Sequence, residues 1–192
     1  MKNMPQRVGR NSFEKDGFYL SKVYDYGLLK DFCCGDCDLD DYFRHDVLKY
    51  HEHLLSQAYM VEWATGDGNI LVALIDFSND TVRSEKWRKN HKDVIGLPYD
   101  KSISLPAVKI TRFGVQNNWQ GLSIGTHIIN MVKELFLTDN RTGCRLITVD
   151  AYNTENALLF YEKNEFQFFN TKDKNKKTRS MFFDLKRLSA SV

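Results

Sequence analysis

One glycine-bearing loop, Gly121–Thr126, holds the residues whose types and spacing best suit chemistry. Glycine lets a backbone approach a ligand closely. The first turn of a helix has unpaired N–H groups and a positive dipole end, which attract anions. The loop therefore predicts a phosphate cradle, and the alternative is a glycine-softened helix entry. No Lys-Ser/Thr pair follows Gly125, so this is not a Walker loop, and the dinucleotide fingerprint G-x-G-x-x-G is also missing.

Cysteine and histidine offer weaker candidates. Cys34-x-x-Cys37 has metal or redox spacing, but no second Cys or His pair with zinc spacing follows it. Reduced thiols near a helix start are the expected state. Three histidines of one helical stretch do not form a clean i, i+4 set of metal ligands, and we expect no metal site; these are His45, His51 and His53. We expect His127 to be a surface or packing residue.

Acidic residues in or at the ends of predicted strands could act as a general base. The candidates are Asp150, Glu62 and Asp76. Because charged residues in strands also serve structural roles, we expect each of them to be structural, and the sequence identifies no base.

The strand and the helix on either side of the glycine loop must position it. Residues 105–115 predict a strand in which Val108 and Ile110 share one phase, while Phe113 and Val115 share the other. A one-residue phase change inside a strand is typical of a β-bulge, which separates neighbouring strands and indicates a cleft. After the loop, apolar residues recur at helical spacing from Ile124 to Leu135.

The remaining elements alternate along the chain. We expect a long helix that is capped by Asp38 and runs to about Gln57, and a short helix that Thr154 caps and that runs to about Asn164. Residues 79–104 predict a long polar loop. The other predicted strands are 18–26, 58–64, 70–77, 144–151, 166–171 and 179–187. The order β–α–β–β–β–α–β–α–β–β predicts a mixed α/β sheet.

Length and composition limit the class of protein. The chain has 192 residues, a net charge of +2 and 42% hydrophobic residues, which are typical of one globular domain. We expect a single domain over 1–192 with flexible ends at 1–17 and 188–192. The sequence shows no membrane segment and no secretory signal, so we expect a cytoplasmic protein. Near-neutral charge argues against wholesale coating of nucleic acid.

Two segments resemble the GNAT acyltransferase superfamily. Gln120–Gly125, with the sequence QGLSIG, resembles motif A, Q/R-x-x-G-x-G/A, including its strand before and helix after. Asn156–Phe166 is similar to the family block A-x-x-F-Y-E-K-x-G-F. Three further segments look like the subgroup of tRNA-acetylating toxins: Phe32–Asp36, Leu39–Phe43 and Leu105–Ile110. The resemblance covers roughly residues 18–187.

The resemblance implies a single-domain GNAT fold. Such a fold has a mixed, mostly antiparallel sheet of about seven strands, helices on both faces, and a splayed, bulged fourth strand. It also implies an N-acetyltransferase that uses acetyl-CoA and no metal. An amine attacks the acetyl group directly in a ternary complex.

The resemblance also implies site residues. Tyr161 matches the family's general acid, and the alternative is a core aromatic residue beside Phe160. Asn153 or Asn156 would bond the pantetheine amide, unless they only cap a helix. Residues Phe113, Gly114 and Val115 would pair with the pantetheine, and the motif would hold the pyrophosphate through Gln120, Gly121, Leu122, Ser123, Ile124, Gly125 and Thr126.

Two residues depart from the family pattern. Ser123 stands at the central motif glycine, where it can supply the same N–H group although its Cβ narrows the approach of the pyrophosphate. Glu165 stands at the usual glycine before Phe166, and it suggests a different turn geometry.

The acceptor stays open among three alternatives. The first is a small-molecule or peptide amine. The second is a toxin-like acetylation of aminoacyl-tRNA, with tRNA and an antitoxin as partners. A basic groove would suit tRNA, and the residues that could supply one are Lys172, Lys174, Lys176, Lys177, Arg179, Arg83, Lys86, Arg88 and Lys89. The third is a CoA-binding regulatory protein without turnover, at which Ser123 hints. A homodimer is a further expected assembly.

Overall fold

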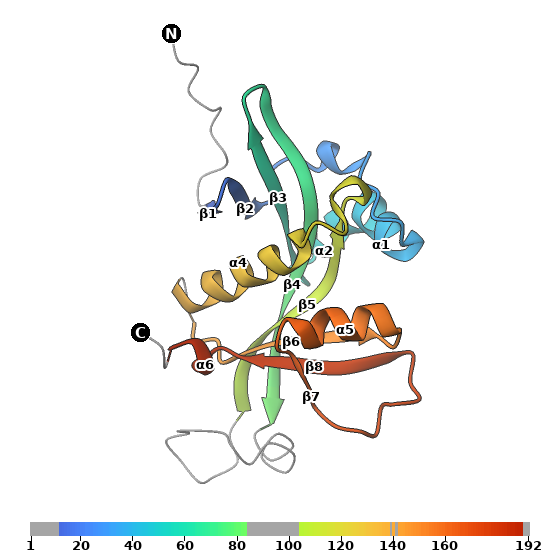
Figure 1. Ribbon diagram of the computed structural model, residues 1–192, viewed down its shortest axis with the longest axis vertical. Coiled ribbons are helices and arrows are strands. Elements are labelled where there is room, and N and C mark those ends of the chain that lie inside the picture. The colour runs from blue at the N-terminus through green and yellow to red at the C-terminus, as the bar shows by residue number, and fades with distance from the viewer. Residues whose placement is uncertain (1–11, 84–103, 139, 141, 190–192) are drawn as a thin grey trace. The chain divides into compact units, whose positions relative to one another are not determined.

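The protein, as a computed structural model, is described over residues 12–83, 104–138, 140 and 142–189. Its strands form one eight-stranded sheet in the order β1-β2-β3-β4-β5-β6-β8-β7 (Figure 1). Strands β5 and β6 pair in parallel. Five other pairs of neighbouring strands are antiparallel, namely β1–β2, β2–β3, β3–β4, β6–β8 and β7–β8. The expected mixed, mostly antiparallel sheet is confirmed. It has eight strands because β1 (Phe13–Lys15) precedes the first predicted strand.

The chain forms two compact units. The first comprises residues 1–78 and 111–132, and the second comprises 79–110 and 133–192. Three elements contribute residues to both units, namely β4 (Gly68–Arg83), β5 (Ser104–Val115) and α4 (Ile124–Thr138).

The first unit begins with three strands and a helical segment between the second and third. Its other elements are β2 (Phe18–Lys22), η1 (Tyr26–Leu29), α1 (Cys37–Asp41), a π-helical turn (Tyr42–Asp46), α2 (Val47–Glu52), β3 (Gln57–Thr65) and, after β5, the short η3 (Asn117–Trp119).

The first helix differs from its prediction at both ends. Asp36, not Asp38, caps it, because the Asp36 carboxylate accepts a hydrogen bond from the Leu39 N–H at 3.0 Å. The helix ends at Glu52 and not at Gln57, because Leu54 adopts a left-handed φ of 56° that no helix can continue.

The core of the first unit joins this helical segment to the sheet. Leu29, Phe32 and Phe43 are fully buried against Met60 of β3 and Leu74 of β4. Phe32 and Phe43 meet edge to face with ring centroids 5.4 Å apart. Burial of two such aromatic side chains is worth several kcal/mol in all, which explains how a short, interrupted helix is held in place.

Two irregularities occur in the strands of the first unit. The pairing of β3 with β4 shifts register between Val61 and Glu62, so that Val72 is an extra residue in β4. The carbonyl of Val72 accepts from the Gln116 N–H at 2.8 Å. In β5, the Thr111 hydroxyl donates to Asp76, to which Tyr42 also donates, and a Cβ on Gly114 would meet Phe32 and Cys34. Tyr42, Phe32 and Cys34 belong to one buried cluster, so these two residues of β5 face it although they are three positions apart. The alternation of side chains therefore breaks inside β5, in agreement with the predicted phase change.

The second unit contains the remaining elements. They are β6 (Leu146–Tyr152), α5 (Glu155–Lys163), β7 (Gln167–Phe168), β8 (Thr178–Asp184) and α6 (Lys186–Ser189). Leu105, Ala107, Leu146 and Phe182 form a buried cluster within it. The predicted loop over 79–104 is partly strand, because β4 continues to Arg83 and β5 begins at Ser104; residues 84–103 lie outside the described residues.

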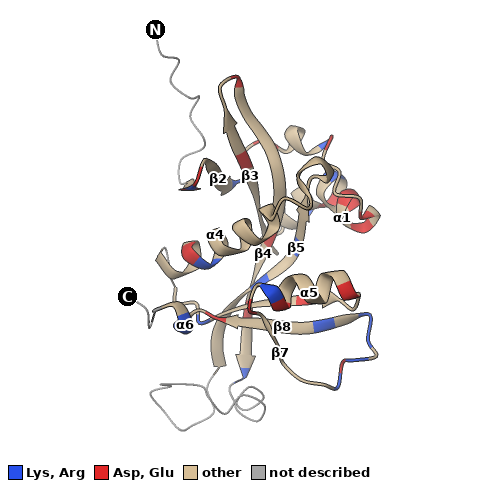
Figure 2. Ribbon diagram, viewed as in Figure 1, with Lys and Arg blue, Asp and Glu red and all other residues tan. Residues whose placement is uncertain are grey.

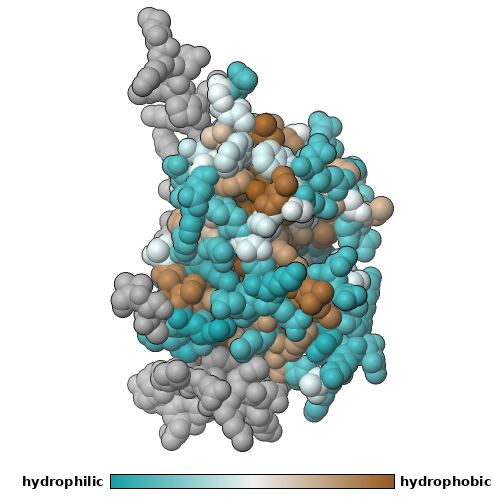
Figure 3. Space-filling model, viewed as in Figure 1, coloured by the Kyte–Doolittle hydropathy of each residue, from teal (hydrophilic) through white to brown (hydrophobic). Residues whose placement is uncertain are grey.

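Charged residues are unevenly distributed along the described chain. Figure 2 shows acidic residues on α1 and basic residues along the segment between β7 and β8. On the face in Figure 3, hydrophobic side chains form small separate patches.

Among the described residues, no helix has both the length and the apolar character that crossing a membrane requires.

Candidate active site

The glycine loop presents its backbone to solvent. Gly121, Leu122 and Ser123 are exposed and lead directly into α4. In the described part of the chain, no hydrogen bond uses the backbone N–H groups of residues 122–125 as donors. Gly121 has a φ of +74°, and a Cβ there would meet no atom within 4 Å. The loop thus offers four adjacent N–H groups at a helix N-terminus, which suits a phosphate.

The side chain of Gln120 holds the loop together. Its Nε2 donates to the Cys34 carbonyl at 2.7 Å and to the Val115 carbonyl at 2.9 Å. These bonds tie the start of the loop to the end of β5. Since the amide donors are used within the protein, Gln120 is a positioning residue, and its direct contact with the cofactor stays a prediction.

Segment 32–34, which we call the clamp, is hydrogen-bonded to residues 116–120 just before the glycine loop. Local sequence patterns did not reveal this contact. The Cys33 N–H donates to Gln116 Oε1 at 2.9 Å, and the Asn117 N–H donates to the Cys33 carbonyl at 3.0 Å. The guanidinium of Arg44 donates to the Phe32 carbonyl. The clamp fixes both the entry and the exit of residues 116–120.

Asp40 anchors the clamp. Its side chain is buried, and Oδ1 accepts from the Cys34 N–H at 2.7 Å. Burial alone would raise the pKa of Asp40, but the hydrogen bonds from residues 33–35 outweigh burial and lower it. Burial also raises the pKa of the Cys34 thiol to about 12, so this cysteine is an inert packing residue.

Replacing Asp40 by asparagine is expected to lower the free energy of unfolding by about 1 kcal/mol at neutral pH, because a charge-assisted hydrogen bond is lost. The lowered pKa of Asp40 means that the carboxylate stabilises the fold above the unfolded-state pKa near 4, and this contribution is lost as pH falls through the folded-state pKa. Urea denaturation from pH 7 to pH 3 should show the two proteins converging in acid. A constant difference at every pH would contradict this role.

Ser123 adopts the conformation that glycine favours. Its φ is 61°, in the left-handed region, and its carbonyl accepts the first helical bond from the His127 N–H at 3.1 Å. Although Ser123 replaces the motif glycine, the loop backbone at this position therefore has the left-handed conformation that a glycine would favour.

The end of β5 leads into the loop. The ladder between β5 and β6 covers Ala107–Ile110, whereas β5 continues to Val115. A Cβ on Gly114 would come within 3.0 Å of Cys34 Sγ and 3.1 Å of Phe32 Cζ. Gly114 thus lets the strand pack closely against the clamp. The predicted pairing of Phe113–Val115 with pantetheine stays a prediction.

Tyr161 lies in the second unit, on α5. It is buried between Phe160 and Phe166, whose ring centroids lie 5.1 and 5.3 Å from its own. Burial raises the pKa of the phenol well above its ordinary value, so Tyr161 keeps its proton at neutral pH. Such a phenol can donate a hydrogen bond or a proton to a thiolate.

The turn after α5 fixes Tyr161. The Phe166 N–H donates to the Tyr161 carbonyl at 3.0 Å, and the Glu165 N–H donates to the Glu162 carbonyl at 2.8 Å. This is the Schellman pattern, whose left-handed residue is usually glycine. Glu165 occupies that position with a φ of 64°. The expectation of a different turn geometry is therefore wrong, because the glutamate adopts the left-handed conformation that glycine prefers.

Replacing Glu165 by glycine is expected to stabilise the protein by about 1 kcal/mol, since glycine has no Cβ penalty in the left-handed region. The carboxylate of Glu165 lies 3.9 Å from Lys133 Nζ and 3.6 Å from Arg187. A Glu165→Ala variant separates the effects, because it removes the charge and keeps the strain. Thermal or urea unfolding that ranks glycine below alanine would contradict the account.

The two asparagines near α5 differ in their contacts. Asn153 Nδ2 donates to the Lys174 carbonyl at 2.7 Å and to the Lys176 carbonyl at 2.9 Å. It therefore holds the segment between β7 and β8. Asn156 is exposed in the first turn of α5. Of the two, Asn156 is the better candidate for a pantetheine contact, which stays a prediction.

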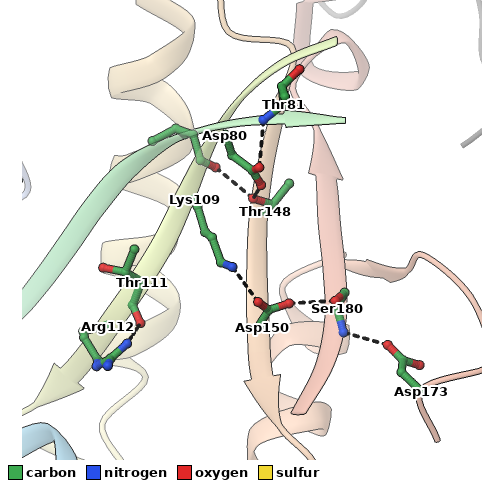
Figure 4. Close-up of polar contacts among 10 residues, drawn as sticks. Asp80, Thr81, Lys109, Thr111, Arg112, Thr148, Asp150, Asp173 and Ser180 are labelled. Carbon is green, nitrogen blue, oxygen red and sulfur yellow. Dashed lines mark hydrogen bonds and ion pairs between the residues drawn. The ribbon is translucent and has the colours of Figure 1, made fainter. Parts of the chain in front are cut away.

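Asp150 is a weak candidate for the base. Figure 4 shows its carboxylate between Lys109, at 2.5 Å, and the Ser180 hydroxyl, at 2.7 Å. Burial tends to raise the pKa of Asp150, but these two donors outweigh burial and lower it. A carboxylate with a lowered pKa is a poor proton acceptor.

Glu62 is buried in β3, and burial raises its pKa. Its strand neighbours are β2 and β4, so β4 separates it from β5. Asp76, the third candidate, is fully buried.

The basic segment between β7 and β8 has four exposed lysines, at 172, 174, 176 and 177. Arg179 does not add to this surface. It is buried, its Nε donates to Asp173 at 2.9 Å, and its guanidinium lies 3.9 Å from the centroid of the Phe168 ring. Arg83 is exposed at the end of β4, whereas Lys86, Arg88 and Lys89 lie outside the described residues.

His127 packs on Phe18, with ring centroids 4.9 Å apart, in agreement with the expected packing role. Within the described ranges, no group of three or more His, Cys, Asp or Glu side chains could hold a metal ion. The four cysteines are free.

The chain has the fold of the GNAT acetyltransferase toxins. Solved structures that it matches include the toxin AtaT bound to the C-terminus of its antitoxin AtaR and acetyl-CoA, as a tyrosine-to-phenylalanine mutant, with a TM-score of 0.62, 18% identity, and coverage of 92% of this chain and 98% of that one. A tyrosine-to-phenylalanine mutant of KacT matches with a TM-score of 0.66, 15% identity, and coverage of 92% and 100%. AtaT complexed with acetyl-methionyl-tRNAfMet matches with a TM-score of 0.65, 19% identity, and coverage of 91% and 98%. No family model and no curated protein matches the sequence.

Proposed function

We propose that the protein is an N-acetyltransferase that moves the acetyl group of acetyl-CoA to an amine. The observation that carries this proposal is the run of N–H groups at residues 122–125, which opens α4, is exposed at 122 and 123, and has no donor role inside the described protein. Such a run of N–H groups at a helix N-terminus suits the phosphate groups of a diphosphate. The fold it shares with acetyl-CoA-bound AtaT supports the same ligand.

The residues around the loop would have separate roles. The N–H groups of Leu122–Thr126 would hold the pyrophosphate, and the Gln120 side chain would keep the loop closed on β5. The backbone of Phe113–Val115 would pair with the pantetheine as a strand. An N–H near Val115 would polarise the thioester carbonyl, where such donors lower barriers by about 3–4 kcal/mol.

Tyr161 would donate the proton that the departing thiolate needs. A free thiol has a pKa near 8.5, so protonation helps the thiolate leave at neutral pH. Because burial keeps the phenol protonated, Tyr161 is in the correct state for this role throughout the physiological range. Neighbouring structures of AtaT and KacT were solved as tyrosine-to-phenylalanine mutants, which supports a functional tyrosine in this fold.

The amino group of an aminoacyl-tRNA is the acceptor we favour. One matching structure is AtaT with acetyl-methionyl-tRNAfMet. The four exposed lysines between β7 and β8 provide the positive charge that a phosphate backbone requires. The third alternative, a binder without turnover, rested on Ser123, whose backbone retains the glycine conformation.

Radiolabelled acetyl-CoA and three acceptors test the proposal: charged tRNA, the same tRNA without its amino acid, and a panel of small amines. We expect label on charged tRNA, none on uncharged tRNA, and weaker labelling of small amines. Replacing Lys174 and Lys176 together by glutamine should weaken tRNA labelling more than small-amine labelling, because the phosphate contacts serve only the former.

The results separate the alternatives. Label on small amines alone would identify a small-molecule acetyltransferase. Coenzyme A binding without any transfer would identify the non-catalytic binder, and both of these outcomes contradict the tRNA proposal.

A further inference from the structure

A buried carboxylate on β4 is bonded to a hydroxyl on β5, in the first unit. Asp76 is 0% exposed, and its Oδ2 accepts from Thr111 Oγ1 at 2.5 Å and from the Tyr42 hydroxyl at 2.9 Å. Its other oxygen, Oδ1, is buried and has no hydrogen-bond partner. Burying an under-bonded carboxylate is costly, so a purely structural role explains it poorly.

The side chains that bond the Asp76 carboxylate are uncharged, since both donors are hydroxyl groups. The guanidinium of Arg112 lies 4.8 Å from the centroid of the Tyr42 ring and donates to the Thr111 carbonyl at 2.8 Å. Figure 4 shows the Thr111–Arg112 contact. The Tyr26 hydroxyl is also buried without a partner, and burial followed by the field of Asp76 raises the pKa of Tyr26. The Asp76 carboxylate is thus held through one oxygen by two hydroxyl groups, while its other oxygen has no hydrogen-bond partner.

Thr111 bonds to the Asp76 carboxylate and lies near the C-terminal end of β5. Unlike Asp76, Thr111 is only partly buried, and its hydroxyl can accept a hydrogen bond while it donates to Asp76. It lies two residues before Phe113, roughly 7 Å along the strand, and Phe113 begins the stretch to which we assign the pantetheine.

We propose that Thr111 and Asp76 form a proton relay that acts as the general base for the acceptor amine. This inference rests on the proposed acetyltransferase function. The incoming ammonium donates to Thr111 Oγ1. Its proton passes to that oxygen as the Thr111 proton passes to Asp76 Oδ2, which leaves a neutral amine and a protonated carboxyl.

The rest of the transfer balances around this step. The amine nitrogen forms the C–N bond to the acetyl carbonyl carbon, and the C–S bond to coenzyme A breaks. The thiolate takes the proton of Tyr161, which recovers one from water. The nitrogen releases its second proton to water, and the Asp76 carboxyl returns its proton to water before the next turnover.

Three substitutions test the relay. Thr111→Val removes the hydroxyl and keeps the shape of the side chain, whereas Thr111→Ser keeps the hydroxyl. Tyr42→Phe removes the other donor to Asp76 and so measures the structural value of bonds to that carboxylate. The measurements are kcat with saturating acetyl-CoA and charged tRNA from pH 6 to pH 9, coenzyme A binding by calorimetry, and melting temperature.

Thr111→Val should lower kcat about 100-fold at pH 7, the size of a general-base effect. The deficit should shrink as pH rises, because a larger share of the amine is then already neutral. Thr111→Ser should stay within about threefold of the wild type, and Tyr42→Phe should lower the melting temperature more than it lowers kcat. Coenzyme A binding should be unchanged in all three variants.

Two results would overturn the relay while leaving the acetyltransferase in place. One is full kcat in Thr111→Val. The other is an equal loss of kcat in Tyr42→Phe and Thr111→Val at every pH, which would indicate a structural network. Wild-type protein that binds coenzyme A and acetylates no amine would overturn both the function and the relay.

Discussion

Tyr161→Phe is expected to lower kcat for acetyl transfer about 100-fold or more, while the Michaelis constant for acetyl-CoA changes little. General-acid catalysis contributes about 10²–10⁴-fold, and phenylalanine keeps the ring and removes only the proton. Tyr161 packs between Phe160 and Phe166, so the substituted ring still fits its site. Steady-state kinetics of thiol release measure the effect.

The matched control for this substitution is Tyr19→Phe on β2. Tyr19 loses the same hydroxyl from a strand to which we assign no catalytic role, so its kinetics should match the wild type. Wild-type kinetics in Tyr161→Phe would show that Tyr161 is only a packing residue. A leaving group of lower thiol pKa should also rescue the variant, because it needs the proton less.

Ser123→Asp is expected to weaken coenzyme A binding about 100-fold without destabilising the fold. Aspartate tolerates the left-handed φ of this position and stabilises a helix N-terminus. Its carboxylate would nevertheless occupy the electrostatic site of the diphosphate. Repulsion of roughly 3 kcal/mol between charges a few ångströms apart near a protein surface accounts for a loss of this size.

Ser123→Asn is the uncharged control, because asparagine has nearly the same shape and the same tolerance of left-handed backbone. Calorimetry should show the asparagine variant binding coenzyme A within a few-fold of the wild type. If both variants bind equally well, the diphosphate does not lie at this loop. If both bind poorly, shape and not charge controls the site.

Local patterns predicted most of the fold because the strands and helices here carry clear periodicity. The strand at 105–115, the helix from Ile124 and the phase change inside β5 were all readable from apolar spacing. The short strand at Phe13–Lys15 was missed, because three residues contain too little alternation to be recognised. The cap at Asp36 was assigned to Asp38 because several aspartates compete in that segment.

The contacts that organise the candidate site depend on residues far apart in the chain. Cys33 and Gln116 are 83 positions apart, and Gln120 reaches back to Cys34 across 86 positions. No local pattern could indicate this clamp. At Glu165 the residue type itself was misleading. A glutamate in place of glycine predicted a different turn, but Glu165 adopts the left-handed conformation of a glycine in a Schellman turn. The hydrogen bond between Asp76 and Thr111 joins two strands, β4 and β5, and no local sequence pattern could indicate it either.

Amide chemical shifts followed during titration with coenzyme A test the account most directly. We expect the largest changes at the N–H groups of residues 122–125, with smaller changes at Phe113–Val115. Pantetheine, which has no diphosphate, should move only the second group. Saturable binding of coenzyme A that leaves the amides of 122–125 unmoved, or no binding by folded protein, would contradict the account.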